Sequence, residues 1–306
     1  MRRGFLAVLV ICCVFLSFHA RPLSADEIPA DARSWSSAVL GAEGLYAGAL
    51  PAPGWHAINY VEYYQTHKLK GRKGREVDMP PDYEASVWAE CLRAVYVADT
   101  KFLGATPAWH AIVPVVNRRD STDIIRDNES GLGDIYVSPL ILGWHNPPWH
   151  YVLGLDVIMP TGEYYPDDFV TIGHNHWTFE PAFAFSYIGK NGFTGSAKIM
   201  YDYHTEDNDI DYEEGQQIHI DYHAGYSFGE NRAWTAGLTG YYLRSLEEDT
   251  FNSNSVDSSE EEVLAVGPSI AYKWEDYLFE LKIQQEIRAK NRPKGTAAWL
   301  KFTYSF

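Results

Sequence analysis

Histidine and aspartate alternate in one short stretch of the chain, at His219, Asp221 and His223. In a β-strand, residues two positions apart point to the same side, so these side chains would share one face. Two imidazoles in such an arrangement can bind a metal ion. The pattern provides no third ligand residue. A second pair, His174 and His176 in a loop, also lacks a third ligand. We therefore expect no metal site and no cofactor.

A nucleophilic serine would be the other obvious source of chemistry. The one G-x-S-x-G sequence, GYSFG at 225–229, lies at the end of a segment with strand periodicity, and no strand-to-helix elbow that would present such a serine is evident. Serine, histidine and acidic residues are numerous enough for a triad, but no spacing favours one. We expect a protein that is not an enzyme. The less favoured alternative is a membrane-embedded, lipid-modifying hydrolase, which would need a serine, a histidine and an acid clustered at the lipid-facing surface.

Charged side chains occupy every second position of otherwise apolar segments. In 277–288, Leu281 and Ile283 alternate with Glu280 and Lys282, so a strand would have one apolar and one charged face. In a membrane barrel the charged face lines the interior. Ten candidates for this lining follow from the alternation: Glu180, Lys198, His219, Asp221, His223, Glu280, Lys282, Glu286, Arg288 and Lys301. They could select solutes, or they could form ion pairs that keep the lumen polar.

Segments with this period of two recur along the chain, as in membrane barrels. The clearest are 149–159, 177–187, 193–204, 217–228, 263–274, 277–288 and 295–306, and weaker ones are 55–66, 83–98, 105–117, 133–144 and 233–244. They predict an all-β, antiparallel transmembrane β-barrel of about 12 strands, an even number as such barrels require. The connections alternate between short turns and longer segments, which predicts short periplasmic turns and long extracellular loops.

The end of the chain and its aromatic content suggest a location. The last strand ends on Phe306, and a terminal aromatic residue on a closing amphipathic strand resembles the C-terminal signature of bacterial outer-membrane barrels. The chain has 21 Tyr, 14 Phe and 10 Trp, many near strand ends, as in the girdles at membrane surfaces. We expect the bacterial outer membrane, with membrane lipid and lipopolysaccharide as partners and Phe306 binding the barrel-assembly machinery. An aromatic-rich soluble core is the alternative.

The first residues have the layout of a secretory signal peptide. Arg2 and Arg3 precede an apolar stretch at 5–18, and small residues lead to Ala25. We expect a signal peptide over 1–25, with cleavage after Ala32 as an alternative and an uncleaved anchor as the less favoured one. The only cysteine after that peptide is Cys91, which cannot form a disulfide within the chain.

The charge of the processed chain excludes one class of partner. Three of the 25 Lys and Arg lie in the predicted signal peptide, whereas all 41 Asp and Glu follow it, which gives 22 − 41 = −19. Such a surface repels nucleic acid. The segments 205–214 and 247–262 are strongly acidic. They could be solvated extracellular loops, or they could bind divalent cations that bridge to the anionic outer leaflet.

Residues 26–54 precede the first strand and lack its periodicity. They are rich in Gly, Ala and Pro, and this composition predicts either a periplasmic segment or a plug inside the barrel. The barrel itself would be formed by residues 55–306. The candidate plug residues are Leu45, Tyr46, Leu50, Pro51 and Pro53.

Several short phrases in fixed order resemble one family. They are GAEGLYAGALPAPG at 41–54, GDIYVSP at 133–139, MPTGEY at 159–164, IGHNHWTFEP at 172–181, VGP at 266–268 and NRPKG at 291–295. Together they cover nearly all of the chain after the signal peptide. The chain resembles the phenol-degradation meta-pathway group of outer-membrane proteins, also called SphA-like proteins. The resemblance implies a transporter associated with aromatic or other hydrophobic compounds, and it supplies no catalytic residues.

These observations predict an outer-membrane channel that takes small hydrophobic or aromatic solutes. The first alternative is a barrel that transports nothing and serves as a structural element or interaction surface.

Overall fold

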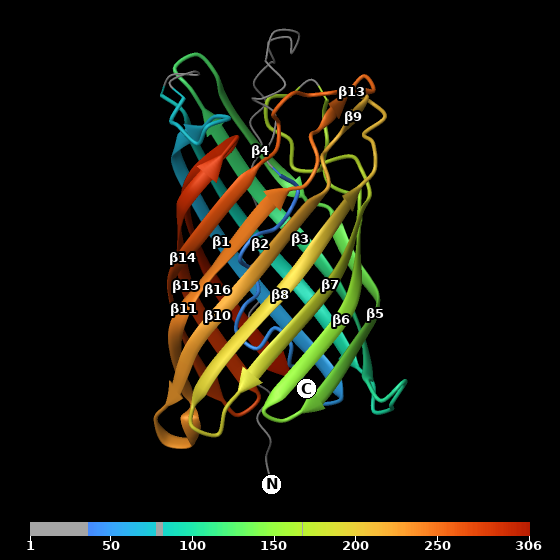
Figure 1. Ribbon diagram of the computed structural model, residues 1–306, viewed down its shortest axis with the longest axis vertical. Coiled ribbons are helices and arrows are strands. Elements are labelled where there is room, and N and C mark those ends of the chain that lie inside the picture. Colours follow the sequence, from blue (N-terminus) through green and yellow to red (C-terminus); the bar gives the residue numbers. More distant parts are fainter. Residues whose placement is uncertain (1–35, 78–81, 167) are drawn as a thin grey trace.

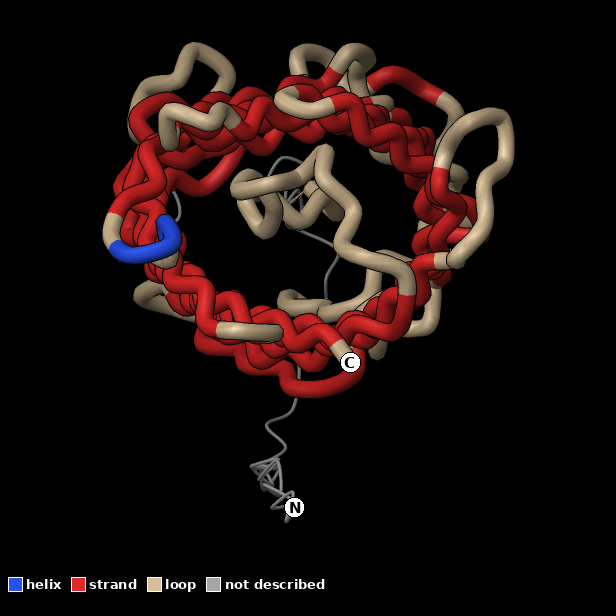
Figure 2. The backbone as a smooth tube through the Cα atoms, turned by 90° about the horizontal axis from the view of Figure 1, so that it is seen from below, coloured by secondary structure: helices blue, strands red, loops and turns tan. Residues whose placement is uncertain are grey.

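The fold is that of a computed structural model, which describes residues 36–77, 82–166 and 168–306. Within these residues, a closed antiparallel barrel of 12 strands forms the whole wall, as predicted (Figures 1 and 2). None of the described helical segments is long and apolar enough to span a membrane. The predicted signal peptide, 1–25, lies outside the described residues.

Twelve strands follow one another around the wall. They are β1 (Gly54–Lys70), β2 (Glu84–Val97), β3 (Thr106–Ser121), β5 (Ile135–Asn146), β6 (Trp149–Met159), β7 (Thr178–Ile188), β8 (Phe193–His204), β10 (Gln217–Phe228), β11 (Trp234–Ser245), β14 (Glu262–Trp274), β15 (Tyr277–Lys290) and β16 (Arg292–Ser305). The barrel closes where β1 pairs with β16, for example Tyr60 with Lys301.

The remaining elements belong to the connections. β4 (Arg126–Leu132) forms a hairpin with the end of β3, whose beginning pairs with β5. β9 (Tyr212–Glu213), β12 (Thr250–Phe251) and β13 (Asn254–Ser255) form a small sheet between two loops, and η2 (Glu230–Arg232) is a single 3-10 turn. We call the end with the longer connections the long-loop rim and the opposite end the short-turn rim. They are the extracellular and periplasmic ends of such a barrel.

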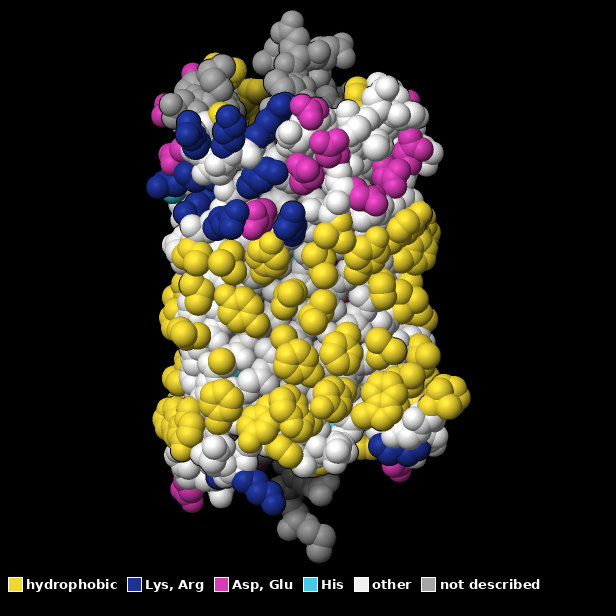
Figure 3. Space-filling view, viewed as in Figure 1, with side chains coloured by type: hydrophobic (Ala, Val, Ile, Leu, Met, Phe, Trp, Pro, Cys, Tyr) yellow, Lys and Arg dark blue, Asp and Glu magenta, His cyan; other side chains and the backbone are white. Residues whose placement is uncertain are grey.

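The alternation read from the sequence becomes an inside-out arrangement of side chains. In β15, Leu281 and Ile283 are 51% and 48% exposed, whereas Glu280 and Lys282 are 2% and 1% exposed. Figure 3 shows the result on one face of the molecule: hydrophobic side chains form a broad band across the wall, and acidic and basic side chains gather above and below it. Lipid can cover this band, while charged side chains of the strands such as Glu280 and Lys282 face the interior.

One predicted lumen residue is misplaced, because β15 contains a β-bulge. The pairing with β14 passes from Leu264–Arg288 to Ala265–Glu286, so Ile287 is an extra residue. An extra residue reverses the alternation beyond it. Arg288 therefore points outward, with 66% of its side chain exposed, and pairs with Glu262 at 3.0 Å. The prediction that Arg288 lines the lumen is wrong.

Residues 36–53, which we call the lumen segment, lie inside the ring of strands (Figure 2). At the long-loop rim, the hydroxyl of Ser36 donates to Gln217 Oε1 at 2.6 Å. The segment then runs through the interior and reaches the short-turn rim, where β1 begins at Gly54. It therefore spans the barrel from one end to the other.

Candidate functional site

The interior of the barrel is the candidate site, because the predicted polar residues meet there. All the predicted lumen residues except Arg288 lie on the inner face, and most of them are buried. Their partners are the lumen segment on one side and neighbouring strands on the other.

Glu43 of the lumen segment lies at the centre of one ion-pair cluster. Its carboxylate accepts from Arg93 Nη1 at 2.6 Å and from Lys301 Nζ at 2.8 Å. The hydroxyl of Tyr60 donates to the same carboxylate at 3.0 Å. These three partners come from β2, β16 and β1, so one side chain ties the segment to three strands. Glu43 and Arg93 were not predicted as site residues, although Glu43 is the only charged residue in 36–53.

The backbone of the lumen segment is held on both sides of Glu43. Asp221 accepts hydrogen bonds from the amides of Gly41 and Glu43, at 2.8 and 2.9 Å. Lys282 Nζ donates to the carbonyls of Ala42 and Glu43, at 2.8 and 2.9 Å. Two predicted lining residues therefore fix the segment instead of facing an open channel.

A second cluster lies on the inner faces of β6, β7, β8 and β10. Lys198 Nζ is 3.1 Å from Glu180 and 3.5 Å from Asp156. His219 Nε2 is 3.0 Å from Asp202 and 3.5 Å from Glu180. The sequence left open whether such charges select solutes or form ion pairs. In this cluster, charges of opposite sign form ion pairs on the inner face of the wall.

The other predicted lining residues are buried with fewer charged partners. Glu286 accepts from the hydroxyls of Tyr64 and Tyr241, each at 2.9 Å. Glu280 Oε1 and His223 Nδ1 have no hydrogen-bond partner among the described residues.

The candidate plug residues divide into two groups. Leu45 is 5% exposed, Tyr46 lies 3.4 Å from the Thr235 hydroxyl, and Leu50 packs on a buried cluster of the wall. Pro51 and Pro53 are exposed at the short-turn rim. The first three thus occupy the interior, as a plug requires.

Gly48 shows how closely the lumen segment approaches the wall. Its amide donates to the Ser186 hydroxyl at 2.9 Å, and a Cβ added at Gly48 would collide with the backbone of Phe185. Only glycine leaves room for this contact with β7.

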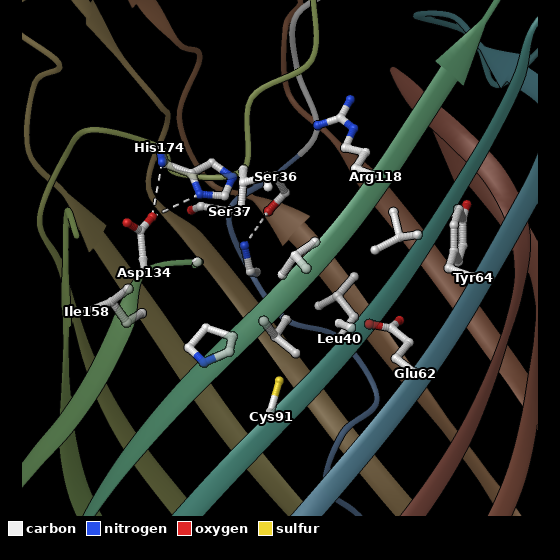
Figure 4. Close-up of a pocket in the computed structure, with 18 of the residues that line it drawn as sticks. Ser36, Ser37, Leu40, Glu62, Tyr64, Cys91, Arg118, Asp134, Ile158 and His174 are labelled. Atoms are coloured by element: carbon white, nitrogen blue, oxygen red, sulfur yellow. Dashed lines mark hydrogen bonds and ion pairs between the residues drawn. The ribbon is translucent and has the colours of Figure 1, made fainter. Parts of the chain in front are cut away.

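A cavity of about 190 Å³ lies between the start of the lumen segment and the wall. Figure 4 shows its lining, to which β1, β2, β3 and β6 contribute. Leu40, Cys91 and Ile158 are among its apolar side chains, and Glu62 and Arg118 are among its charged ones. Cys91 is on the inner face of β2, in register with Tyr60 of β1.

The two acidic loops at the long-loop rim contact each other. Asp249 accepts from the Gly215 amide at 2.8 Å, and β12 pairs with β9. Burial raises the pKa of Asp249 to about 6, and the nearby Glu214 carboxylate acts in the same direction.

Comparison with known proteins agrees with this architecture. An outer membrane channel from Pseudomonas putida F1 has a TM-score of 0.76 at 15% identity, over 85% of this chain and 97% of that one. The beta domain of the Bordetella autotransporter BrkA has a TM-score of 0.48 at 10% identity, over 84% and 100% of the two chains. The translocator domain of NalP from Neisseria meningitidis has a TM-score of 0.46 at 9% identity, over 85% of this chain and 91% of that one.

At these identities the first structure shows the fold, that of an outer-membrane channel. A search of curated proteins finds no match. The family model described as "Putative MetA-pathway of phenol degradation" matches residues 64–302, most of the chain, as the resemblance in the sequence had indicated. The chain therefore belongs to this phenol-degradation family of barrels.

Proposed function

We propose that the protein is a channel of the bacterial outer membrane for small hydrophobic or aromatic solutes, and that these bind in the cavity beside the lumen segment. The observation that carries the proposal is the size and lining of this cavity. Its volume is about 190 Å³, and an apolar cavity of about 150 Å³ in another protein holds benzene. A single aromatic ring therefore fits between Leu40, Cys91 and Ile158.

The polar groups of the cavity suit a ring that carries a hydroxyl or carboxyl group. Glu62, Arg118 and His174 lie at its border and could orient such a substituent, as a few polar groups do in largely apolar binding sites. The name of the family, with its reference to phenol degradation, supports this class of solute, and the Pseudomonas putida neighbour is itself named a channel. Passage through the lumen requires the lumen segment to move.

The expected surroundings of the barrel are part of the same proposal. The apolar band suits membrane lipid, and the acidic loops suit divalent cations that bridge to lipopolysaccharide. Phe306 is 76% exposed next to the short-turn rim, where the barrel-assembly machinery could bind it.

Conductance of single molecules in planar bilayers tests the proposed solute class. The refolded chain from residue 26 should give discrete steps that phenol and toluene reduce, whereas glucose should not. Ala89 lines the cavity, so Ala89→Trp should abolish the effect of the aromatic solutes. Ala94 lies on the outer face of the same strand, so Ala94→Trp is the matched control and should behave as the wild type.

Two results would contradict the proposal. Steps that are equally sensitive to phenol in Ala89→Trp would exclude the cavity as the binding site. The absence of steps from protein shown to be folded would favour a barrel that transports nothing.

A further inference from the structure

Three buried side chains of metal-binding type meet at the long-loop rim, at the edge of the cavity proposed for solutes, which His176 also lines. His176 precedes β7, His204 ends β8, and Glu214 lies in the loop before β10. Their exposed fractions are 5%, 0% and 7%. One ligand atom of each lies within 4.8 Å of the other two. The sequence named His174 and His176 without a third ligand, and the fold supplies His204 and Glu214.

His204 gives an independent indication that a ligand is bound here. Its Nδ1 lies 3.0 Å from the hydroxyl of Thr178, whereas its Nε2 is buried with no hydrogen-bond partner among the described residues. If Nδ1–H donates to Thr178, the lone pair of Nε2 points into the cluster. Metal-bound imidazoles are oriented in this way by a hydrogen bond at the other ring nitrogen. A buried nitrogen without a partner is otherwise costly.

The other two side chains approach each other in the same cluster, where the Ser37 amide also donates to Glu214 Oε2 at 3.4 Å. Oε1 of Glu214 accepts a hydrogen bond from Gln217 Nε2 at 2.8 Å, and Oε2 of Glu214 lies 3.6 Å from His176 Nε2. The rings of His176 and His204 lie edge to face, with their centroids 5.1 Å apart. His176 Nε2 therefore faces the carboxylate, and a ring nitrogen of His204 lies within 4.8 Å of both.

We propose that His176, His204 and Glu214 bind a zinc ion, with the fourth position open to water. Two imidazoles and one carboxylate form a recognised ligand set for zinc sites that keep an open position. Ligands of one zinc ion lie about 2.0–2.2 Å from it, so in a tetrahedral site two of them are about 3.3–3.6 Å apart. The 3.6 Å between His176 Nε2 and Glu214 Oε2 matches this spacing, and small side-chain rotations would bring the His204 nitrogen to the same distance.

The other histidine–carboxylate cluster of the barrel does not suit a metal ion equally well. Glu180, Asp202 and His219 also lie within 4.8 Å of one another. Lys198 already places its ammonium group 3.1 Å from Glu180, and so supplies the positive charge there. No lysine or arginine is paired with Glu214 among the described ion pairs.

Zinc bound at this point would connect the wall to the lumen segment. Glu214 also accepts from the amide of Ser37, at 3.2 Å. The ion would thus join the loop before β7, the end of β8 and the loop that holds the start of the lumen segment. His176 also lines the solute cavity, but zinc binding does not rest on the solute proposal, since it requires no passage through the barrel.

The test is titration of Zn²⁺ alone into the refolded, chelator-treated chain in detergent, with a chromogenic zinc indicator as competitor. One ion should bind per chain, and His204→Gln and Glu214→Gln should each weaken binding at least 100-fold. Co²⁺ should give the visible absorption of a tetrahedral site in the wild type and not in these two variants. Ca²⁺ and Mg²⁺ should not compete, because they prefer oxygen ligands.

His150→Gln is the matched control, because His145 and His150 form an exposed pair whose Nδ1 atoms lie 2.8 Å apart. This variant should bind zinc like the wild type. The shift in gel mobility on heating, which separates folded from unfolded barrels, confirms folding of each variant. Tight binding that survives His204→Gln and Glu214→Gln, or that disappears in His150→Gln, would overturn the proposal. A wild type that binds no zinc would do so as well.

Discussion

Glu43 holds the lumen segment, so Glu43→Gln should release it. The substitution keeps the size of the side chain but removes the charge that pairs with Arg93 at 2.6 Å and Lys301 at 2.8 Å. Loss of one partner from a buried ion pair costs roughly 3–5 kcal/mol. We take the lower value, about 3 kcal/mol, because the Glu43 side chain retains some exposure and glutamine can still accept a hydrogen bond.

The thiol of Cys91 provides the assay. It lines the cavity that Ser36 to Leu40 cover, and it is the only cysteine after the predicted signal peptide. When opening is fast, the labelling rate with a neutral, water-soluble maleimide is proportional to the open population. A tenfold change in population corresponds to about 1.4 kcal/mol, so Glu43→Gln should raise the rate about 100-fold.

Glu76→Gln is the control, because its partner Lys70 lies at 2.9 Å on the exposed surface. Exposed pairs contribute about 0–1 kcal/mol, and this one does not touch the lumen segment. Its labelling rate should equal that of the wild type. The reasoning is refuted if Glu43→Gln changes the rate by less than about threefold, under 1 kcal/mol. It also fails if Cys91 of the folded wild type reacts as fast as in the unfolded chain.

Three further predictions follow from contacts elsewhere. Gly48→Ala should raise Cys91 labelling as well, because its methyl group collides with the backbone of β7; unchanged labelling would contradict the close approach. The pKa of Asp249 is raised to about 6, so its stabilising contribution is complete below about pH 4 and is lost as pH rises through 6. Hydrogen exchange of the Gly215 amide, corrected for its intrinsic rate, should slow at low pH, and Asp249→Asn should remove this dependence. Ile283→Arg, on the lipid face of β15, should cost about 2–4 kcal/mol in urea unfolding from bilayers; an unchanged unfolding midpoint would place that face outside the lipid.

Fold class and strand positions could be read from the sequence because the signal is local. A strand turns alternate residues to opposite faces whatever it pairs with, so Leu281 and Glu280 reveal their environments without any neighbour. The same logic identified Lys301 and Asp221 as interior residues. It failed at Arg288, because a bulge is a feature of the pairing between β14 and β15 and leaves no mark in the alternation before it.

The composition of the lumen segment suggested a plug, but only the closed barrel decides what such a plug touches. Glu43 is the only charged residue of the segment but was not predicted as a site residue, and its partners Arg93 and Lys301 lie on strands far apart in sequence. The candidate zinc site is a clearer case, since His176, His204 and Glu214 come from three separate elements and share no motif.

Apart from Arg288 beyond the bulge, the sequence by itself therefore determined which of the predicted residues face the interior, because that choice depends on backbone geometry within one strand. Which interior residues meet depends on strand order, register and closure, which are properties of the whole chain. Only the tertiary structure could bring Glu43 to Arg93, or His204 to Glu214.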